Sequence, residues 1–237
     1  METQFFRTQM LLGEAAMAKL ARSRVAVFGV GGVGGYAVEA LARSGIGALD
    51  LIDNDVVSLS NLNRQIIATH ASIGKPKVEV ASDRIRDINP ACRVTTHQVF
   101  VLPDTIATFD FSQYDYVVDA IDTIAGKIAL IGAARQANVP VISSMGAGNK
   151  LDPTRFRVSD ISKTDTDPLA KVMRTKLRQL GIRKVKVVWS DEIPVKPSAM
   201  EQSSAQKRTP PGSVAFVPSV AGLILASEVV KDLVDIN

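Results

Sequence analysis

A glycine-rich run follows an apolar stretch near the start of the chain and could bind phosphate. The stretch Val25–Phe28 runs directly into the sequence GVGGVGG, whose spaced glycines are Gly29, Gly31, Gly32 and Gly34. Glycines let a backbone turn sharply and expose its N–H groups, and with the N-terminus of a following helix these groups attract phosphate. A second apolar stretch, Ala48–Ile52, ends at Asp53, whose carboxylate can accept both hydroxyls of a ribose. The pattern predicts a nucleotide site and, taken alone, would also suit NAD.

Polar and cationic residues follow Asp53 and change the predicted chemistry. Asn61 and Arg64 lie in the sequence NLNRQ, and Lys77 ends the sequence GKPK. An Arg fork and a compact Lys charge stabilise negative charge on a phosphoryl group and on departing pyrophosphate. An oxidoreductase that transfers hydride would leave these residues without a role. They therefore favour a triphosphate under attack over a nicotinamide ring.

Alternating strand and helix patterns predict the scaffold that must hold these residues. Such alternation is typical of an α/β fold with a Rossmann-like, doubly wound, mostly parallel sheet, in which ligands lie at the carboxyl ends of the strands. Gly29, Asp53 and the segment 119–122 fall at such ends. The predicted strands are Val25–Phe28, Ala48–Ile52, Arg93–Val101, Tyr114–Ile121 and Val139–Ser143, and the predicted helices are Tyr36–Ser44, Pro76–Asn89 and Gly126–Asn138.

The last third of the chain has a different character. We expect residues 1–150 to form a nucleotide-binding core and residues 151–237 a smaller C-terminal αβ extension of the same single domain. Two strands, Arg155–Val158 and Val185–Trp189, flank a helix that starts at Asp167-Pro168 and stops before Gly181. Residues 191–212 are polar and rich in proline, as in a mobile crossing loop, and the closing helix is expected over 219–234. The stretch 171–186 has no acidic residue, and its candidate anion-binding cations are Lys171, Arg174, Arg178, Arg183, Lys184 and Lys186.

Composition excludes several classes of protein. The chain has 237 residues, of which 46% are hydrophobic and 22% charged, so it can bury an ordinary core. Its single cysteine, Cys92, excludes a disulfide framework and a CxxC zinc site, and fits a reducing cytosol. The N-terminus lacks a signal-peptide pattern, and the apolar run Ser219–Val230 is shorter than the roughly 20 residues that span a bilayer. We expect a cytoplasmic protein without zinc or a membrane segment, and its net charge of +4 is compatible with a polyanionic partner.

Taken together, the residues around the glycine run resemble the ubiquitin-activating-enzyme-like adenylyltransferases. This superfamily includes the ThiF/MoeB-type activators of sulfur-carrier proteins. The resemblance covers the chain from residue 7 to about residue 148, and the glycine run matches the family's nucleotide loop. It implies that ATP is the ligand, with Asp53 at the ribose and Asp55 in the same loop. The residues that match the family's phosphate contacts are Asn61, Arg64 and Lys77.

The same resemblance assigns two further residues. Asp122 matches the family's magnesium-binding aspartate, and a hard cation such as Mg²⁺ prefers carboxylate oxygen. Arg7 matches an arginine that family members insert into the partner's active site, which implies a homodimer. Adenylation needs no general base, because the attacking carboxylate is already anionic. Arg64, Lys77 and Arg7 would then be catalytic by stabilising negative charge, and Asp122 by holding the Mg²⁺ ion.

Within the superfamily, the sequence is most similar to the branch that dehydrates threonylcarbamoyladenosine in tRNA. This similarity covers nearly the whole chain and includes Gly146–Gly148, Asp152–Thr154 and Asp167–Leu169. It implies that the enzyme adenylates the threonyl carboxylate of the nucleoside next to the anticodon, and that an atom of the same side chain displaces AMP and closes a ring. The nucleophile then comes from the substrate, so no enzyme cysteine is required. The stretch 171–186 would hold the anticodon stem-loop through phosphate contacts.

Other functions stay open at this point. An activator of a ubiquitin-like sulfur-carrier protein would adenylate a C-terminal glycine and would not need RNA, although the chain lacks the cysteines common in such activators. A nonenzymatic nucleotide-binding scaffold would not need a complete set of phosphate ligands. Whether a sulfur-relay partner protein assists is also open. The cations of the stretch 171–186 could instead form an ordinary solvated helix face.

Overall fold

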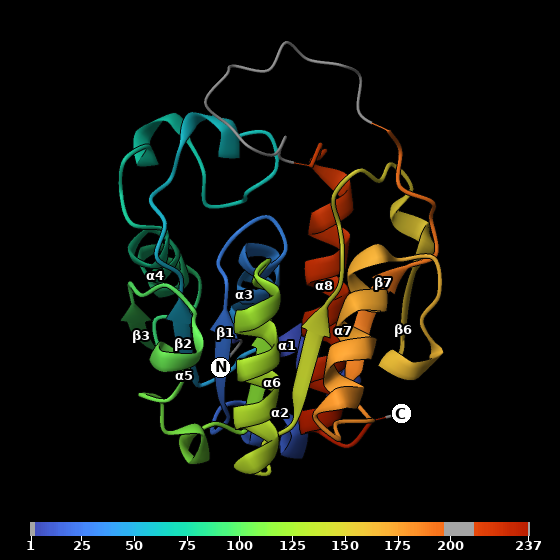
Figure 1. The fold of residues 1–237 in the computed structure, drawn as a ribbon. Coiled ribbons are helices and arrows are strands. Elements are labelled where there is room, and N and C mark those ends of the chain that lie inside the picture. The colour runs from blue at the N-terminus through green and yellow to red at the C-terminus, as the bar shows by residue number, and fades with distance from the viewer. Residues whose placement is uncertain (1–2, 197–210, 237) are drawn as a thin grey trace.

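A seven-stranded sheet forms the centre of the computed structural model, which describes residues 3–196 and 211–236. The strand order is β3-β2-β1-β4-β5-β7-β6 (Figure 1). All neighbouring strands are parallel except β6 and β7, which pair antiparallel at one edge. The predicted mostly parallel, doubly wound α/β fold is therefore confirmed. The strands are β1 (Arg24–Phe28), β2 (Ala48–Ile52), β3 (Arg93–His97), β4 (Tyr116–Asp119), β5 (Val141–Ser144), β6 (Phe156–Asp160) and β7 (Lys186–Ser190).

Helices cover both faces of the sheet (Figure 1). The chain begins with two short helices, α1 (Phe6–Leu12) and α2 (Glu14–Leu20). One face of the sheet packs mainly against α3 (Gly34–Arg43), α4 (Lys77–Ile88) and α8 (Phe216–Leu233). The opposite face packs against α5 (Pro103–Ile106), α6 (Ile124–Gln136) and α7 (Pro168–Gln179).

The central strands are apolar because both of their faces are buried. Successive side chains of a strand point to opposite faces, so Val25 and Val27 of β1 enter the core under α3 and α8. Ala26 and Phe28 enter the core under α5 and α6. Such two-sided burial explains the near-continuous apolar runs from which the parallel strands were predicted.

Several element ends differ from the sequence predictions. β3 stops at His97 instead of Val101, because residues 99–101 leave the sheet and line a pocket. β4 stops at Asp119 for the same reason, since residues 120–123 line the same pocket. α8 begins at Phe216, three residues before the predicted start, because Pro218 lies in the first turn, where a helix needs no N–H donor. α1, α2 and α5 were not predicted.

The C-terminal helix α8 is packed into the nucleotide-binding half of the molecule. A Cβ atom on Gly222 would lie 2.2 Å from the carbonyl oxygen of Val33, so only glycine lets α8 approach the glycine loop this closely. The predicted crossing loop 191–212 lies mostly outside the described residues, which end at Lys196 and resume at Pro211. Among the described helices, none combines the length and the apolar character needed to cross a membrane.

Candidate active site

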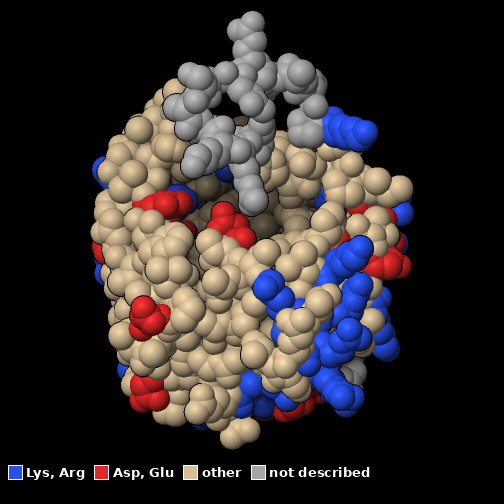
Figure 2. All heavy atoms as spheres, in the orientation of Figure 1, with Lys and Arg blue, Asp and Glu red and all other residues tan. Residues whose placement is uncertain are grey.

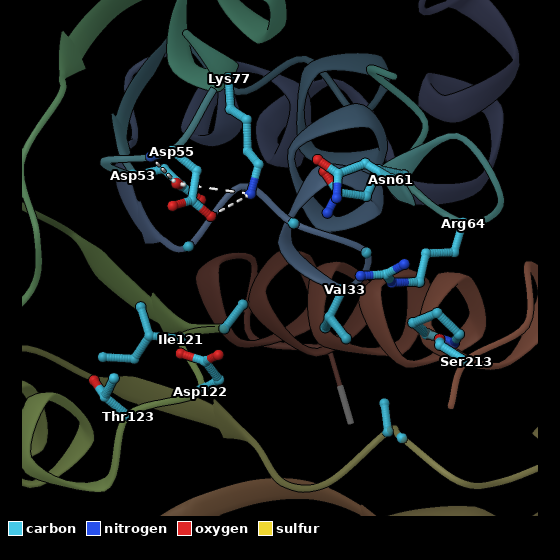
Figure 3. A pocket seen from close by; sticks show the side chains of 18 of the residues that line it. Val33, Asp53, Asp55, Asn61, Arg64, Lys77, Ile121, Asp122, Thr123 and Ser213 are labelled. Atoms are coloured by element: carbon cyan, nitrogen blue, oxygen red, sulfur yellow. Dashed lines mark hydrogen bonds and ion pairs between the residues drawn. The ribbon is translucent and has the colours of Figure 1, made fainter. Parts of the chain in front are cut away.

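A pocket of about 480 Å³ opens at the carboxyl ends of β1, β2 and β4 (Figure 3). This volume suits a ligand of nucleotide size. Of the residues expected at the nucleotide, all except Gly34 line this one pocket. The lining comes from the segments 29–33, 52–55, 61–65, 99–101, 120–123, 147–148 and 211–213, together with Lys77 and Pro218.

The four glycines of the loop have two different structural roles. Gly29 has a φ of 91°, and a Cβ atom on Gly34 would lie only 1.7 Å from the Gly29 carbonyl oxygen, so these two glycines allow the tight turn itself. Gly31 and Gly32 face the pocket. The nearest atom to a Cβ on Gly31 would be Nε2 of Gln65 at 3.9 Å. The loop backbone is therefore open to a ligand at Gly31 and at Gly32, just before the N-terminus of α3.

Asp53 joins the glycine loop to the loop after β2. Its Oδ2 atom accepts the Val30 N–H at 2.7 Å, and its Oδ1 atom accepts the Asp55 N–H at 2.9 Å. A carboxylate has further acceptor capacity on both oxygens, so these two bonds leave lone pairs for a ligand hydroxyl.

Lys77 is a buried cation held by the carboxylates after β2. Its Nζ atom lies 2.7 Å from Asp55 Oδ2 and 4.0 Å from Asp53 Oδ1 (Figure 3). Lys77 is the first residue of α4, where the helix dipole disfavours a cation, so the pairing with Asp55 offsets an unfavourable position. Asp55 also accepts the Lys77 backbone N–H through its carbonyl oxygen at 3.0 Å. The structure thus gives Asp55 a role that the sequence did not indicate, which is to orient Lys77.

Asn61 lies beside Lys77, and Arg64 lies further to the right in the same view (Figure 3). Asn61 is buried, and its Oδ1 atom accepts the Ser58 N–H at 3.0 Å, which closes the 3₁₀ turn Leu59–Asn61. Arg64 donates through Nη1 to the Ser60 carbonyl oxygen at 2.9 Å. The pocket therefore has two cations in its wall, Lys77 on the first turn of α4 and Arg64 just after the 3₁₀ turn.

Asp122 lies across the pocket from both cations, in the loop after β4 (Figure 3). Its side chain is exposed and has no hydrogen-bond or ion-pair partner within residues 3–196 and 211–236. A carboxylate with open lone pairs at the edge of a pocket fits the coordination of a hard divalent cation.

A buried ion pair beneath the Asp122 loop was not anticipated from the sequence. Lys127 of α6 is fully buried, and its Nζ atom lies 3.1 Å from Asp119 Oδ1 and 2.7 Å from the Ser144 carbonyl oxygen. Asp119 also accepts the Ser143 hydroxyl at 2.6 Å and the Ile121 N–H at 3.3 Å. These contacts tie α6, β4 and β5 together under the pocket. The available signal was a lysine inside the apolar sequence of α6.

Gln65 lines the pocket as well, and its sequence context did not indicate a role for it. It is 6% exposed, and its Oε1 atom is buried without a hydrogen-bond partner in the described parts of the chain. Such a group costs free energy unless something pairs with it, so its place in the pocket wall suits a contact with a bound ligand.

Cys92 is buried and lies next to the amino end of β3, whereas the pocket lies at the carboxyl ends of the strands. Burial raises the pKa of the Cys92 thiol to about 11. At neutral pH the thiol therefore stays protonated, and a protonated thiol is a poor nucleophile.

The predicted basic stretch does not form one surface. Lys171, Arg178, Arg183 and Lys184 are exposed on α7 and just after it, and we call these four residues the α7 basic patch. Figure 2 shows blue side chains gathered over α7 at the lower right of the molecule. None of the four lines the pocket.

Two residues of the stretch, Lys186 and Arg174, lie apart from the patch and have other contacts. Lys186 is in β7, and the alternation of the strand points it to the opposite face, where Nζ lies 2.7 Å from Asp232 and 3.1 Å from Glu228 of α8. Arg174 is half-buried and donates to the Thr164 carbonyl oxygen at 2.6 Å. Both side chains are already used within the fold.

Arg7 is exposed on α1 and does not line the pocket of its own chain. Exposed apolar side chains surround it on the same short helix. Phe6, Met10 and Leu11 are 50%, 71% and 87% exposed, respectively. A helix with this much apolar surface is typical of a protein interface.

The parallel sheet, the glycine loop before α3 and the pocket at the strand ends define a Rossmann-like nucleotide-binding protein. A family model described as "ThiF family" matches residues 6–237. The chain therefore belongs to the ThiF family.

Named relatives resemble the chain over nearly its full length. It is 49% identical to a tRNA threonylcarbamoyladenosine dehydratase of Bacillus subtilis over 97% of this chain and 94% of the relative. Its fold matches the crystal structure of the E. coli dehydratase TcdA in complex with ATP, with a TM-score of 0.89, 40% identity and coverage of 98% of this chain and 94% of that one. The complex of TcdA with AMP matches over the same shares of both chains, with 40% identity and a TM-score of 0.88.

Proposed function

We propose that this chain dehydrates threonylcarbamoyladenosine in tRNA and converts ATP to AMP and diphosphate in doing so. The observation that supports this most strongly is the end-to-end likeness to dehydratases, including one whose structures hold ATP and AMP. The pocket contributes two cations, an open carboxylate and an exposed glycine loop, and adenylate formation requires groups of these kinds.

In this proposal ATP binds along the carboxyl ends of the strands. The phosphates lie over Gly31 and Gly32, which present backbone N–H groups and the N-terminus of α3. Asp53 accepts the ribose hydroxyls with the lone pairs that its two backbone contacts leave open. The apolar wall formed by residues 99–101 gives the purine ring a surface to pack against.

The first step joins the threonyl carboxylate to the α-phosphorus of ATP. A carboxylate oxygen attacks phosphorus, the bond to the bridging oxygen breaks, and diphosphate leaves with the electron pair. Arg64 and Lys77, which both line the pocket, stabilise the charge that grows on the phosphoryl and leaving oxygens. Asp122 would hold Mg²⁺ through its open carboxylate, and the ion when bound would neutralise phosphate charge.

The second step closes the ring. An atom of the same threonylcarbamoyl side chain attacks the acyl carbon, the acyl–oxygen bond breaks, and AMP leaves with the oxygen that came from the carboxylate. The nucleophile loses its proton, so the nucleoside has lost one water in total. Because no enzyme nucleophile takes part, the distance of Cys92 from the pocket is compatible with this chemistry.

The tRNA would approach from the side formed by residues 151–237, with residues 1–150 as the nucleotide-binding core. The α7 basic patch offers four exposed cations for phosphates of the anticodon stem-loop. The side chains of Lys186 and Arg174 already pair with Asp232 and with the Thr164 carbonyl oxygen, so in this proposal the four residues of the patch make the phosphate contacts.

A homodimer would complete the active site with Arg7 from the partner. The exposed apolar side chains of α1 support burial of this helix in an interface, and Arg7 on the same helix would then reach the other pocket. A sulfur-relay partner protein stays a prediction from the family resemblance alone.

The direct test is an incubation with ATP, Mg²⁺ and tRNA that carries threonylcarbamoyladenosine, followed by mass spectrometry of the nucleosides. We expect that nucleoside to lose one water and AMP to form in equal amount, with Asp122→Ala abolishing both. tRNA without the modification is the matched control and should yield no AMP. ATP binding without any change in nucleoside mass would contradict the proposal, and diphosphate exchange driven by a carrier protein would then test the sulfur-carrier alternative.

A further inference from the structure

Two hydrogen bonds hold one nitrogen of the Arg64 guanidinium. Nη1 donates to the Ser60 carbonyl oxygen and to Asn63 Oδ1, both at 2.9 Å. A guanidinium carries five N–H donors in one plane, and these contacts occupy the two on Nη1. Nη2 and Nε have no hydrogen-bond partner within the described residues. The plane is therefore fixed at one nitrogen while a fork of three donors stays available to a phosphate.

Asn63 is itself held by a segment from much later in the chain. Its Oδ1 atom accepts from Arg64, and its Nδ2 atom donates to the Ser213 carbonyl oxygen at 3.0 Å. Figure 3 shows Ser213 beside Arg64. One side-chain amide thus connects Arg64 to a segment that comes 150 residues later than Asn63 in the chain.

Asn149 is hydrogen-bonded to the segment that carries Ser213. Its backbone N–H donates to the Gly212 carbonyl oxygen at 2.8 Å, and its Oδ1 atom accepts the Gly212 N–H at 2.7 Å. Asn149 has a φ of 57°, a left-handed conformation that Asn adopts more readily than most residues. Beside it, a Cβ atom on Gly148 would lie 2.8 Å from Pro211 Cβ, so glycine is needed for this close seating.

We propose that Asn63 is a positioning residue for Arg64, and that Asn149 acts on it through Gly212 and Ser213. Asn63 lies in the sequence NLNRQ, and Asn149 lies in the loop after β5. Together these two residues hold the open donors of Arg64 toward the phosphates of ATP. The inference rests on the proposed function only in taking ATP as the ligand.

The experiment is a double-mutant cycle on ATP affinity. The dissociation constant of ATP with Mg²⁺ is measured by calorimetry, without tRNA, for the native chain, Asn63→Ala, Arg64→Ala and the double variant. We expect Arg64→Ala to weaken binding about tenfold and Asn63→Ala about fivefold, as the loss of charge-assisted hydrogen bonds predicts. In the Arg64→Ala background the second substitution should change the constant by less than about twofold, because Asn63 acts through Arg64. If the two effects multiply, the inference is wrong.

Asn149 offers a matched pair of variants. Asn149→Gly keeps the left-handed backbone but removes the acceptor for Gly212, whereas Asn149→Asp keeps an acceptor and tolerates the same φ. We expect Asn149→Gly to weaken ATP binding about threefold and Asn149→Asp to remain within about twofold of the native chain. Equal losses in both would overturn the role given to the acceptor.

Thermal unfolding of each variant separates loss of folding from loss of positioning. A native chain that does not bind ATP would defeat the proposed function itself. If the native chain binds ATP but the effects of Asn63→Ala and Arg64→Ala on the dissociation constant multiply, only this inference is contradicted.

Discussion

Alanine at two glycines of the same loop should have opposite consequences. At Gly34 the added methyl carbon would lie 1.7 Å from the Gly29 carbonyl oxygen, so the backbone would have to move by about 1.7 Å to reach ordinary contact. At Gly31 the nearest atom would be 3.9 Å away, and the methyl group would project into the pocket. Gly34→Ala therefore tests the turn, and Gly31→Ala tests the surface that the turn presents.

The size of each effect follows from these distances. Overpacking costs about 3 kcal/mol where neither side can move easily. Here a Cβ fixed to the first residue of α3 meets a backbone oxygen just after β1. Alanine has a higher helix propensity than glycine by about 1 kcal/mol, which offsets part of this cost at the start of α3. The net decrease in the free energy of unfolding is about 2 kcal/mol. For a chain of 237 residues this lowers the Tm by about 4–8 °C. Gly31→Ala should shift the Tm by less than about 2 °C but weaken ATP binding at least about tenfold.

Scanning calorimetry gives the Tm of both variants without ligand, and titration calorimetry gives their ATP affinity. The native chain and Gly132→Ala, an exchange with no atom within 4 Å of the new Cβ, serve as references. Native-like stability of Gly34→Ala would refute the close approach described for the loop. Native-like ATP affinity of Gly31→Ala would refute the placement of phosphate over that residue.

Three further predictions concern charge and reactivity. Lys77→Met should lower the free energy of unfolding by no more than about 1 kcal/mol, because its partner Asp55 is exposed to solvent. The same substitution should reduce turnover at least about hundredfold, and turnover equal to that of the native chain would show that Lys77 has no catalytic role. Arg178→Glu with Lys184→Glu should raise the KM for tRNA and flatten its salt dependence while the KM for ATP stays constant, and an unchanged KM for tRNA would exclude the α7 basic patch. Burial raises the pKa of Cys92 to about 11, so this thiol should react with a maleimide at pH 8 only after denaturation. Cys92→Ala should keep native turnover. Fast labelling of the folded chain would contradict the burial of Cys92.

The sheet could be predicted from the sequence because its central strands are buried on both faces. Their apolar runs are long enough to mark β1, β2, β4 and β5 without any tertiary information. The end of β3 could not be predicted, because an apolar residue at 99–101 looks the same whether it enters a sheet or lines a pocket. The first two helices were missed because each has seven residues, and the two together bury one side chain, Leu20.

The candidate site was predictable where short motifs carry it, and not where distant segments meet. The glycine loop, Asp53 and Lys77 were expected at one nucleotide, and they line one pocket, while their roles toward ATP stay predictions. The pairing of Lys77 with Asp55 joins residues 22 positions apart and depends on how the loop after β2 returns to α4. The pairing of Lys186 with α8 could not be predicted, because a run of cations along the sequence does not reveal which face of a strand each one takes.

The most direct test of carboxylate adenylation follows one oxygen atom of the threonyl carboxylate. tRNA whose threonylcarbamoyladenosine carries heavy oxygen in the threonyl carboxylate is incubated with the chain, ATP and Mg²⁺, and the AMP is analysed by mass spectrometry. Adenylation of the carboxylate predicts one heavy oxygen in the phosphate of each AMP formed, together with a nucleoside lighter by one water. AMP without the label would show that the carboxylate oxygen never joined the α-phosphorus, and would contradict the account.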